Sequence, residues 1–349
     1  MSEPLVVLDA DVLGRRRTGD ESYVSALLAE LARLDHGLRL AAVTRHPGLV
    51  PDGVEPVLLD ARSQMVRMSI QFPRLLRRLG PQLAHFQHVV PPACPCPAVV
   101  TIHDLSFERH PELMSRRDRL VFRTMVPRSV RRAARVLAVS EQTKRDVVEY
   151  YRIPDEKIVV TPNGVDPLFS PQGHRAEGAP YALFVGTLQP RKDPLVALEA
   201  LALVPGELRL VLVGPDKGSG EDARRAAGRL GLNGRVTFTG HVEKEQLAEL
   251  YRGAVCLVFP SRYEGFGLPV VEAMASGTPV VAAASGSVPE VAGDAAVLVE
   301  PGNAAALAGG IERALADRER LVGAGLARAK RYNWAETAGR TLDVYRELL

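Results

Sequence analysis

The chain has 349 residues, enough for two domains, and its 46% hydrophobic and 24% charged residues exclude a disordered protein. Its net charge of 44 − 41 = +3 is too small to favour nucleic-acid binding. No apolar run reaches the roughly 18 residues that span a bilayer, and the first residues lack the pattern of a secretory signal, so we expect a cytoplasmic protein. Cys94, Cys96 and Cys256 form neither a disulfide framework nor a zinc spacing, which fits a reducing compartment.

Strand-like and helix-like segments alternate in the first half of the chain. The stretch 23–34 places Val24, Leu27, Leu28 and Leu31 on one helical face. Short apolar runs rich in β-branched residues are expected to form strands at 5–9, 38–44, 83–88, 98–104 and 135–140. Such alternation predicts parallel βαβ units and a doubly wound sheet.

A second alternation follows a break in the pattern. Residues 165–180 are rich in Pro and Gly and have no apolar period, so we interpret them as an interdomain linker. Further strands are then expected at 181–187, 208–214, 235–240, 254–261, 278–283 and 295–300. The predicted fold class is α/β, with two Rossmann-like doubly wound domains facing across a cleft. Their expected extents are 1–170 and 171–330, and a final helix at 331–349 is expected to pack back toward the first domain.

The strongest chemical signal is the string SRYEGFGLPVVEAMASGTPV at 261–280. It predicts a strand end, a glycine loop that contains Glu264, and a helix with Pro269 and Glu272 in its first turn. The loop amides and the helix dipole suit an anion, whereas Glu264 and Glu272 would repel phosphate and are better acceptors for sugar hydroxyls. The combination indicates a nucleotide diphosphate with a sugar at each end. The alternative is a capped helix with two solvated acids.

At this string the chain resembles the retaining glycosyltransferases of family 4, the group 1 glycosyltransferases, which have the GT-B fold. Glu264 and Glu272 match the family's pair of glutamates separated by seven residues. The resemblance covers nearly the whole chain. It implies that Glu272 binds the nucleotide ribose and that the donor sugar contacts Glu264 and the following backbone. These backbone contacts are expected at Gly265, Phe266, Gly267 and Leu268.

The string GTLQPRKD at 186–193 is a second match. The resemblance assigns Arg191 and Lys192 to the pyrophosphate leaving group and places Gly186 and Thr187 in the donor site. The family more often has Asn where Asp193 stands, and either residue can cap a helix. Taken alone, the Arg-Lys pair could equally be a solvated surface pair.

Three weaker matches complete the expected site. His103 follows a predicted strand, and the resemblance makes it a contact to the donor sugar near the reacting centre. Gly19 stands in a loop at 14–23 where the family has a glycine-rich turn; here Asp20 and Glu21 are added, and these acids are candidates for acceptor hydroxyls. The base is expected at the backbone of Gly240, His241 and Val242.

No cofactor and no metal are expected. Asp9 and Asp11 have the Asp-x-Asp form of metal-dependent glycosyltransferases, but they end the first strand of the wrong domain. The resemblance implies retention of anomeric configuration. Catalytic roles are predicted for His103, Glu264, Arg191 and Lys192.

The predicted reaction moves a hexose, with mannose as a guess by resemblance, from a nucleotide sugar to a saccharide or polyprenyl-linked saccharide in cell-surface polysaccharide or glycolipid assembly. The basic amphipathic stretch 112–136 suggests peripheral attachment to the anionic inner face of the cell membrane, with a solvated basic face as the alternative. The rival functions are transfer to a small-molecule acceptor, a nucleotide-sugar epimerase, an NAD-dependent oxidoreductase and a non-catalytic sugar-binding protein.

Overall fold

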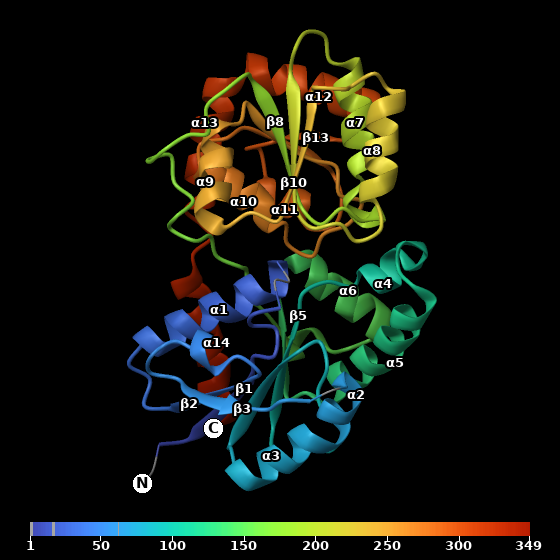
Figure 1. Cartoon of the computed structure of the whole chain (residues 1–349). Helices are drawn as coiled ribbons and strands as arrows, with labels where there is room; N and C mark the ends of the chain where they lie inside the picture. Colours follow the sequence, from blue (N-terminus) through green and yellow to red (C-terminus); the bar gives the residue numbers. More distant parts are fainter. Residues whose placement is uncertain (1–2, 16–17, 62) are drawn as a thin grey trace. The chain divides into compact units, whose positions relative to one another are not determined.

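The computed structural model describes residues 3–15, 18–61 and 63–349, which form two compact units. Unit 1 comprises the residues up to Gly164 together with Asn333–Leu349, and unit 2 comprises Val165–Tyr332. Each unit is a parallel sheet with helices on both faces, as Figure 1 shows. The predicted fold class of two Rossmann-like α/β domains is therefore confirmed.

Unit 1 has a seven-stranded parallel sheet in the order β3-β2-β1-β4-β5-β6-β7. Its strands are β1 (Leu5–Asp9), β2 (Arg39–Thr44), β3 (Glu55–Leu58), β4 (Leu83–Gln87), β5 (Ala98–Ile102), β6 (Arg135–Ala138) and β7 (Ile158–Val160). Its helices are α1 (Thr18–Arg33), α2 (Gln64–Val66), α3 (Phe72–Leu79), α4 (Ser106–Arg109), α5 (Arg116–Arg132), α6 (Glu141–Tyr151) and α14 (Trp334–Leu348). The strand order reverses between β1 and β4, so the crevice at the carboxyl ends of this sheet lies there.

Unit 2 has a six-stranded parallel sheet in the order β10-β9-β8-β11-β12-β13. Its strands are β8 (Tyr181–Val185), β9 (Arg209–Val213), β10 (Val236–Gly240), β11 (Cys256–Phe259), β12 (Val280–Ala283) and β13 (Val297–Val299). Its helices are α7 (Pro194–Leu203), α8 (Gly220–Arg229), α9 (Lys244–Gly253), α10 (Leu268–Ala275), α11 (Val288–Ala292), α12 (Ala304–Ala316) and α13 (Arg318–Ala329). Here the order reverses between β8 and β11.

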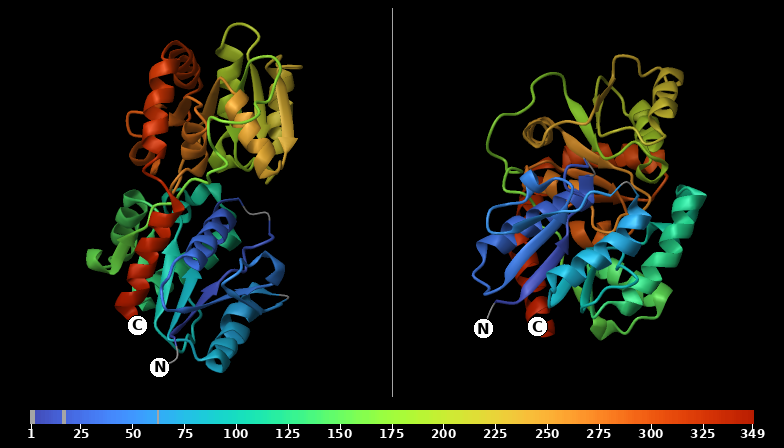
Figure 2. Two further views of the ribbon diagram at one scale, coloured as in Figure 1. Left: turned by 90° about the vertical axis from the view of Figure 1, so that its left-hand side faces the viewer. Right: turned by 60° about the horizontal axis from the view of Figure 1, so that its bottom comes forward.

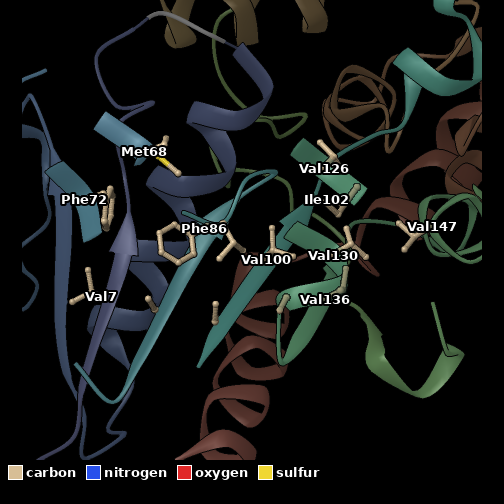
Figure 3. Close-up of a cluster of buried hydrophobic side chains, with 14 of the residues drawn as sticks. Val7, Met68, Phe72, Phe86, Val100, Ile102, Val126, Val130, Val136 and Val147 are labelled. Atoms are coloured by element: carbon tan, nitrogen blue, oxygen red, sulfur yellow. The ribbon is translucent and has the colours of Figure 1, made fainter. Parts of the chain in front are cut away.

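The core of unit 1 lies between the sheet and one layer of helices. Alternate strand residues such as Val7, Phe86 and Val100 pack against Phe72 of α3 and Val130 of α5 (Figure 3). These side chains are fully buried, and each such burial stabilises the fold by about 1.5–3 kcal/mol. The strands alternate because successive side chains point to opposite faces of the sheet.

The opposite face of this sheet is covered by α1 and by the C-terminal helix α14, which lie side by side (Figures 1 and 2). His85 of β4 is hydrogen bonded to Tyr345 of α14 over 2.6 Å. The chain enters α14 beside Gly164, where a Cβ atom would stand only 2.2 Å from the backbone nitrogen of Trp334. The C-terminal helix is thus part of unit 1.

The predicted linker at 165–180 contains neither helix nor strand and belongs to unit 2. Arg252 of α9 holds it, donating to the carbonyl oxygen of His174 over 2.6 Å, and Ala176 donates its amide to Glu249. The chain passes between the units at Gly164–Val165 and again at Tyr332–Asn333.

Two strands escape the sequence analysis, and both lie at an edge of the unit 1 sheet. β3 contains Pro56 and has largely exposed side chains, while β7 has only three residues. Edge strands carry Pro and polar residues that weaken the apolar signal. Two local expectations are also wrong. Gly19 lies in the first turn of α1 and not in a loop, and Glu272 lies in the second turn of α10 and not the first.

Candidate functional site

The candidate site in unit 2 lies at the point where the strand order reverses. The loop after β8 begins at Gly186, and the loop after β11 runs from Pro260 to Gly267. Since β8 and β11 are neighbours and parallel, both loops leave the same edge of the sheet. Open α/β sheets bind ligands at this position.

Hydrogen bonds and an ion pair tie the two loops together. Arg262 donates its amide to the carbonyl oxygen of Arg191 over 2.9 Å, and its side chain pairs with Asp193 over 2.7 Å. Arg191 Nη1 in turn donates to the carbonyl oxygen of Tyr263 over 2.6 Å. Asp193 is the N-cap residue of α7 in a left-handed conformation, but its side chain makes no capping hydrogen bond. Its carboxylate connects the loops instead.

Glu264 and the two predicted cations meet in one buried cluster. Lys192 Nζ lies 2.5 Å from Glu264 Oε1, and Arg191 Nη1 lies 3.2 Å from Glu264 Oε2. Burial by itself raises the pKa of Glu264, but the charges of Lys192 and Arg191 outweigh it and hold the pKa below its ordinary value. The cluster carries a formal charge of +2 − 1 = +1. It can therefore attract a diphosphate although it contains a carboxylate.

The backbone of Glu264 is held by the segment before α11. Ser287 donates both its amide, over 3.0 Å, and its hydroxyl, over 3.1 Å, to the carbonyl oxygen of Glu264. Gly286 has a φ of 54°, and a Cβ atom there would lie 2.3 Å from that same oxygen. Only glycine fits this approach, so Gly286 and Ser287 position Glu264.

Lys192 lies over Gly186 at the end of β8. A Cβ atom on Gly186 would contact the lysine stem at 3.4–3.6 Å, and Lys192 Nζ stands 5.4 Å from the centre of the Phe259 ring. Thr187, which follows Gly186 in the chain, is also buried. Packing of the stem leaves the ammonium group few other positions.

The loop from Gly265 to Leu268 leads into α10. Gly267, the N-cap residue, has a φ of 94° and no side chain with which to cap the helix. Phe266 is buried and makes an edge contact with Tyr332. Helix amides that lack a side-chain cap form a suitable anion site.

Glu272 is held by a partner that sequence analysis does not identify. Tyr251 of α9 donates its hydroxyl to Glu272 Oε2 over 2.9 Å. Burial raises the pKa of Glu272 to about 7, against the smaller lowering effects of the Tyr251 hydrogen bond and the charge of Lys244. The carboxylate can accept further hydrogen bonds, which suits a diol.

The predicted base-binding residues lie two strands away from β8 on the same sheet. Gly240 ends β10 with a φ of 71°, His241 is exposed and Val242 is partly exposed.

His103 and Gly19 belong to unit 1. His103 follows β5, lies 2.8 Å from Gln87 through Nε2 and stacks edge-on against Tyr23 at 4.7 Å. Burial lowers its pKa to about 4, against a smaller raising effect of Asp20, so the ring is neutral at pH 7. Gly19 has open space around it.

Both carboxylates of the Asp-x-Asp pair form ion pairs with arginines. Asp9 pairs with Arg67 over 2.6 Å, and Asp11 pairs with Arg45 over 2.9 Å and with Arg15. In the described part of the chain these carboxylates are therefore ion-pair partners of arginines.

Comparisons with known proteins identify the family of the chain. Residues 165–332 match the sequence model of the family described as glycosyl transferases group 1, and residues 17–168 match that described as Glycosyltransferase Family 4. The O-antigen chain mannosyltransferase B of Escherichia coli is 32% identical over 268 residues, which cover 72% of this chain and 70% of the relative. The D-inositol 3-phosphate glycosyltransferase of Nocardia farcinica is 36% identical over 236 residues, 61% of this chain but only 52% of the relative.

Solved structures share the fold over nearly their whole length. Sucrose-phosphate synthase of Thermosynechococcus elongatus superposes with a TM-score of 0.81 at 24% identity and 99% coverage of both chains. Anabaena HepE, solved in complex with UDP-glucose, gives 0.78 at 19% identity, with 99% of this chain and 100% of that one covered. The two doubly wound units define a glycosyltransferase of the GT-B fold. The chain belongs to the group 1 glycosyltransferase family.

Proposed function

We propose that the protein transfers a hexose from a nucleotide diphosphate sugar to a saccharide or polyprenyl-linked saccharide acceptor in the cytoplasm. The observation that carries this proposal is the buried cluster of Glu264, Lys192 and Arg191 at the strand reversal of unit 2. A relative named as an O-antigen mannosyltransferase supports mannose as the sugar. A structural neighbour solved with UDP-glucose supports a nucleotide-sugar donor.

In this proposal Lys192 and Arg191 stabilise the negative charge that grows on the departing diphosphate. Glu264 accepts hydrogen bonds from donor-sugar hydroxyls, with the amides of Gly265–Leu268 beside it, and Glu272 accepts from the ribose hydroxyls. The base lies at Gly240, His241 and Val242. Because two cations already face the diphosphate, the reaction needs no metal ion as a catalyst.

The proposed chemistry is retention at the anomeric carbon. The acceptor oxygen forms a bond to that carbon while the bond from carbon to the diphosphate oxygen breaks. The acceptor proton passes to the departing phosphate on the same face of the sugar, so no enzymic base is required. His103 serves as a neutral hydrogen-bonding contact to the donor sugar, and Gly19 as a donor-site residue; both roles come from the family resemblance alone.

A second candidate function is transfer to a small phosphorylated acceptor. Seven relatives, including that of Nocardia farcinica, are named D-inositol 3-phosphate glycosyltransferases and are 34–37% identical over part of their length. Parallel transfer assays with inositol 3-phosphate and with polyprenyl-linked saccharides separate the two candidates. Donor turnover without any acceptor would indicate an epimerase instead.

Donor binding is the test of the proposed site. Titration calorimetry with GDP-, UDP- and dTDP-sugars should find one tight donor and no affinity for NADH. If Glu272 must be ionised to accept from the ribose, its pKa of about 7 makes the ionised fraction rise about tenfold between pH 6 and pH 8. The donor affinity should rise by the same factor. The Glu272→Gln variant should bind the donor more weakly, and its affinity should not rise between pH 6 and pH 8. A pH dependence like that of the wild type in this variant would exclude the assignment.

The helix α5 is the proposed membrane contact. Leu120 and Val121 are 67% and 42% exposed, and exposed arginines surround them along the helix. No helix among the described residues has both the length and the apolarity to cross a bilayer. An anionic bilayer surface fits a basic helix with exposed apolar residues, and the cytoplasmic face of a membrane offers one.

Binding to lipid vesicles tests this contact. The protein should sediment with phosphatidylglycerol vesicles but not with phosphatidylcholine vesicles, and less so at high salt. A basic residue near such a surface contributes about 1 kcal/mol, so replacing Arg116 and Arg117 by Gln should weaken binding about tenfold or more. The matched control replaces Arg224 and Arg225 of unit 2 by Gln in the same way. Equal losses in both double variants would contradict the proposal.

A further inference from the structure

One cluster of side chains in unit 1 includes His103, and as a group it has no role in the proposed transfer chemistry. Asp20, His88 and His103 each offer a ligand atom, and these three atoms lie within 4.8 Å of one another. The three residues are far apart in sequence and show no ligand spacing, so no sequence pattern points to this group. The fold brings them together at the carboxyl edge of the sheet.

The elements that carry the cluster fix its position. In the sheet register Gln87 of β4 is the partner of Thr101 of β5, so the residues after the two strands emerge side by side. His88 donates its amide to the carbonyl oxygen of Thr101 over 2.9 Å. Its ring centre lies 5.2 Å from that of His103. Asp20 is added from the first turn of α1.

His88 is strained and incompletely satisfied. Its φ of 58° lies in the left-handed region, which is unfavourable for a residue other than glycine. Its Nδ1 atom is buried and has no hydrogen-bond partner among the described residues. A buried nitrogen without a protein partner is rare, and coordination of an ion would satisfy it.

His103 is oriented in the manner of a metal ligand. Its Nε2 atom donates to the side-chain oxygen of Gln87 over 2.8 Å, which leaves Nδ1 as the nitrogen with a free lone pair. Metal-binding histidines are held in this way, with the second ring nitrogen hydrogen bonded to an oxygen.

We propose that Asp20, His88 and His103 form a binding site for a transition-metal ion, with Zn²⁺ as the best fit. Two imidazoles and one carboxylate suit zinc and leave a fourth position for water. Zinc bonds of about 2.0–2.1 Å require the ligand atoms to draw closer together by side-chain rotation. An ion bound to His103 would prevent this residue from contacting the donor sugar, so the ion is an inhibitor of transfer and not a cofactor of the enzyme. This consequence rests on the proposed function, whereas the metal site itself does not.

The test measures metal binding without any donor. Chelator-treated protein should bind one equivalent of Zn²⁺ in calorimetry, and zinc absorption-edge spectroscopy should count two imidazole ligands. Asp20→Asn and His88→Asn should each weaken binding at least about tenfold. Asparagine tolerates a positive φ, so the second variant removes the imidazole while sparing the backbone.

His174→Asn, at an exposed histidine of unit 2, is the matched control and should bind zinc like the wild type. A wild-type spectrum without two imidazole ligands would overturn the proposal even if a variant failed to fold. So would unchanged zinc affinity in a folded His88→Asn protein. A protein that binds zinc but no nucleotide sugar would support this site while refuting the proposed function.

Discussion

Replacing Lys192 by alanine is expected to lower the turnover number for glycosyl transfer by about 10²–10³, with a smaller change in donor affinity. Removal of one preorganised group that faces developing charge has this effect in other enzymes. The ammonium of Lys192 is held by Glu264 and by packing over Gly186, so it needs little reorganisation during the reaction. Initial rates with the donor identified by calorimetry measure the loss.

Two further variants make the result interpretable. Lys192→Arg keeps the charge and should recover part of the rate, and Lys217→Ala removes an exposed lysine of the same unit and should have no effect. Circular dichroism would establish that the Lys192→Ala protein is folded. Near wild-type turnover in that folded variant would refute the assignment of the cation cluster to the leaving group.

Replacing Arg67 by methionine is expected to lower the free energy of unfolding of unit 1 by about 3–5 kcal/mol. Arg67 is fully buried and lies 2.6 Å from Asp9 and 3.6 Å from Asp11. Breaking a buried ion pair leaves a buried charge without compensation, and this costs more than the pair contributes. Urea unfolding followed by circular dichroism measures the difference.

The matched controls test the cause of this loss. Arg45 also pairs with Asp11, but its side chain is 31% exposed. Arg45→Met should therefore lower the free energy of unfolding by about 1 kcal/mol or less. Adding Asp9→Asn to Arg67→Met removes the stranded charge and should restore part of the stability. An Arg67→Met protein as stable as the wild type would contradict this account of the buried ion pair.

Central strands could be predicted from sequence because both of their faces are buried. β5 and β12 read as continuous apolar runs for this reason. The edge strands lack such a run: β3 contains Pro56 and is largely exposed, and β7 has only three residues. The membership of α14 in unit 1 depends on His85 meeting Tyr345, a contact across 260 positions that no local pattern contains.

The candidate site likewise contains residues that local sequence predicts and residues that only the fold reveals. Glu264, Lys192 and Arg191 are recognisable because they stand in short strings with loop and helix signals around them. Tyr251 and Gly286, by contrast, act through close approach: one donates to Glu272, and the other leaves room for a carbonyl oxygen. Most tyrosines in helices and most glycines after strands have no such role, so only the folded chain reveals these two. His88 escapes sequence analysis for the same reason: only the fold brings it beside His103 and Asp20.

The passage of the chain out of unit 1 and back again has a consequence for biosynthesis. Unit 2 is a single uninterrupted stretch, so every residue it needs has been synthesised before α14 exists. The seven-stranded sheet has part of one face uncovered until α14, which carries Tyr345, has been synthesised. The domain made second can therefore be finished first, which reverses the usual order in which domains mature on the ribosome.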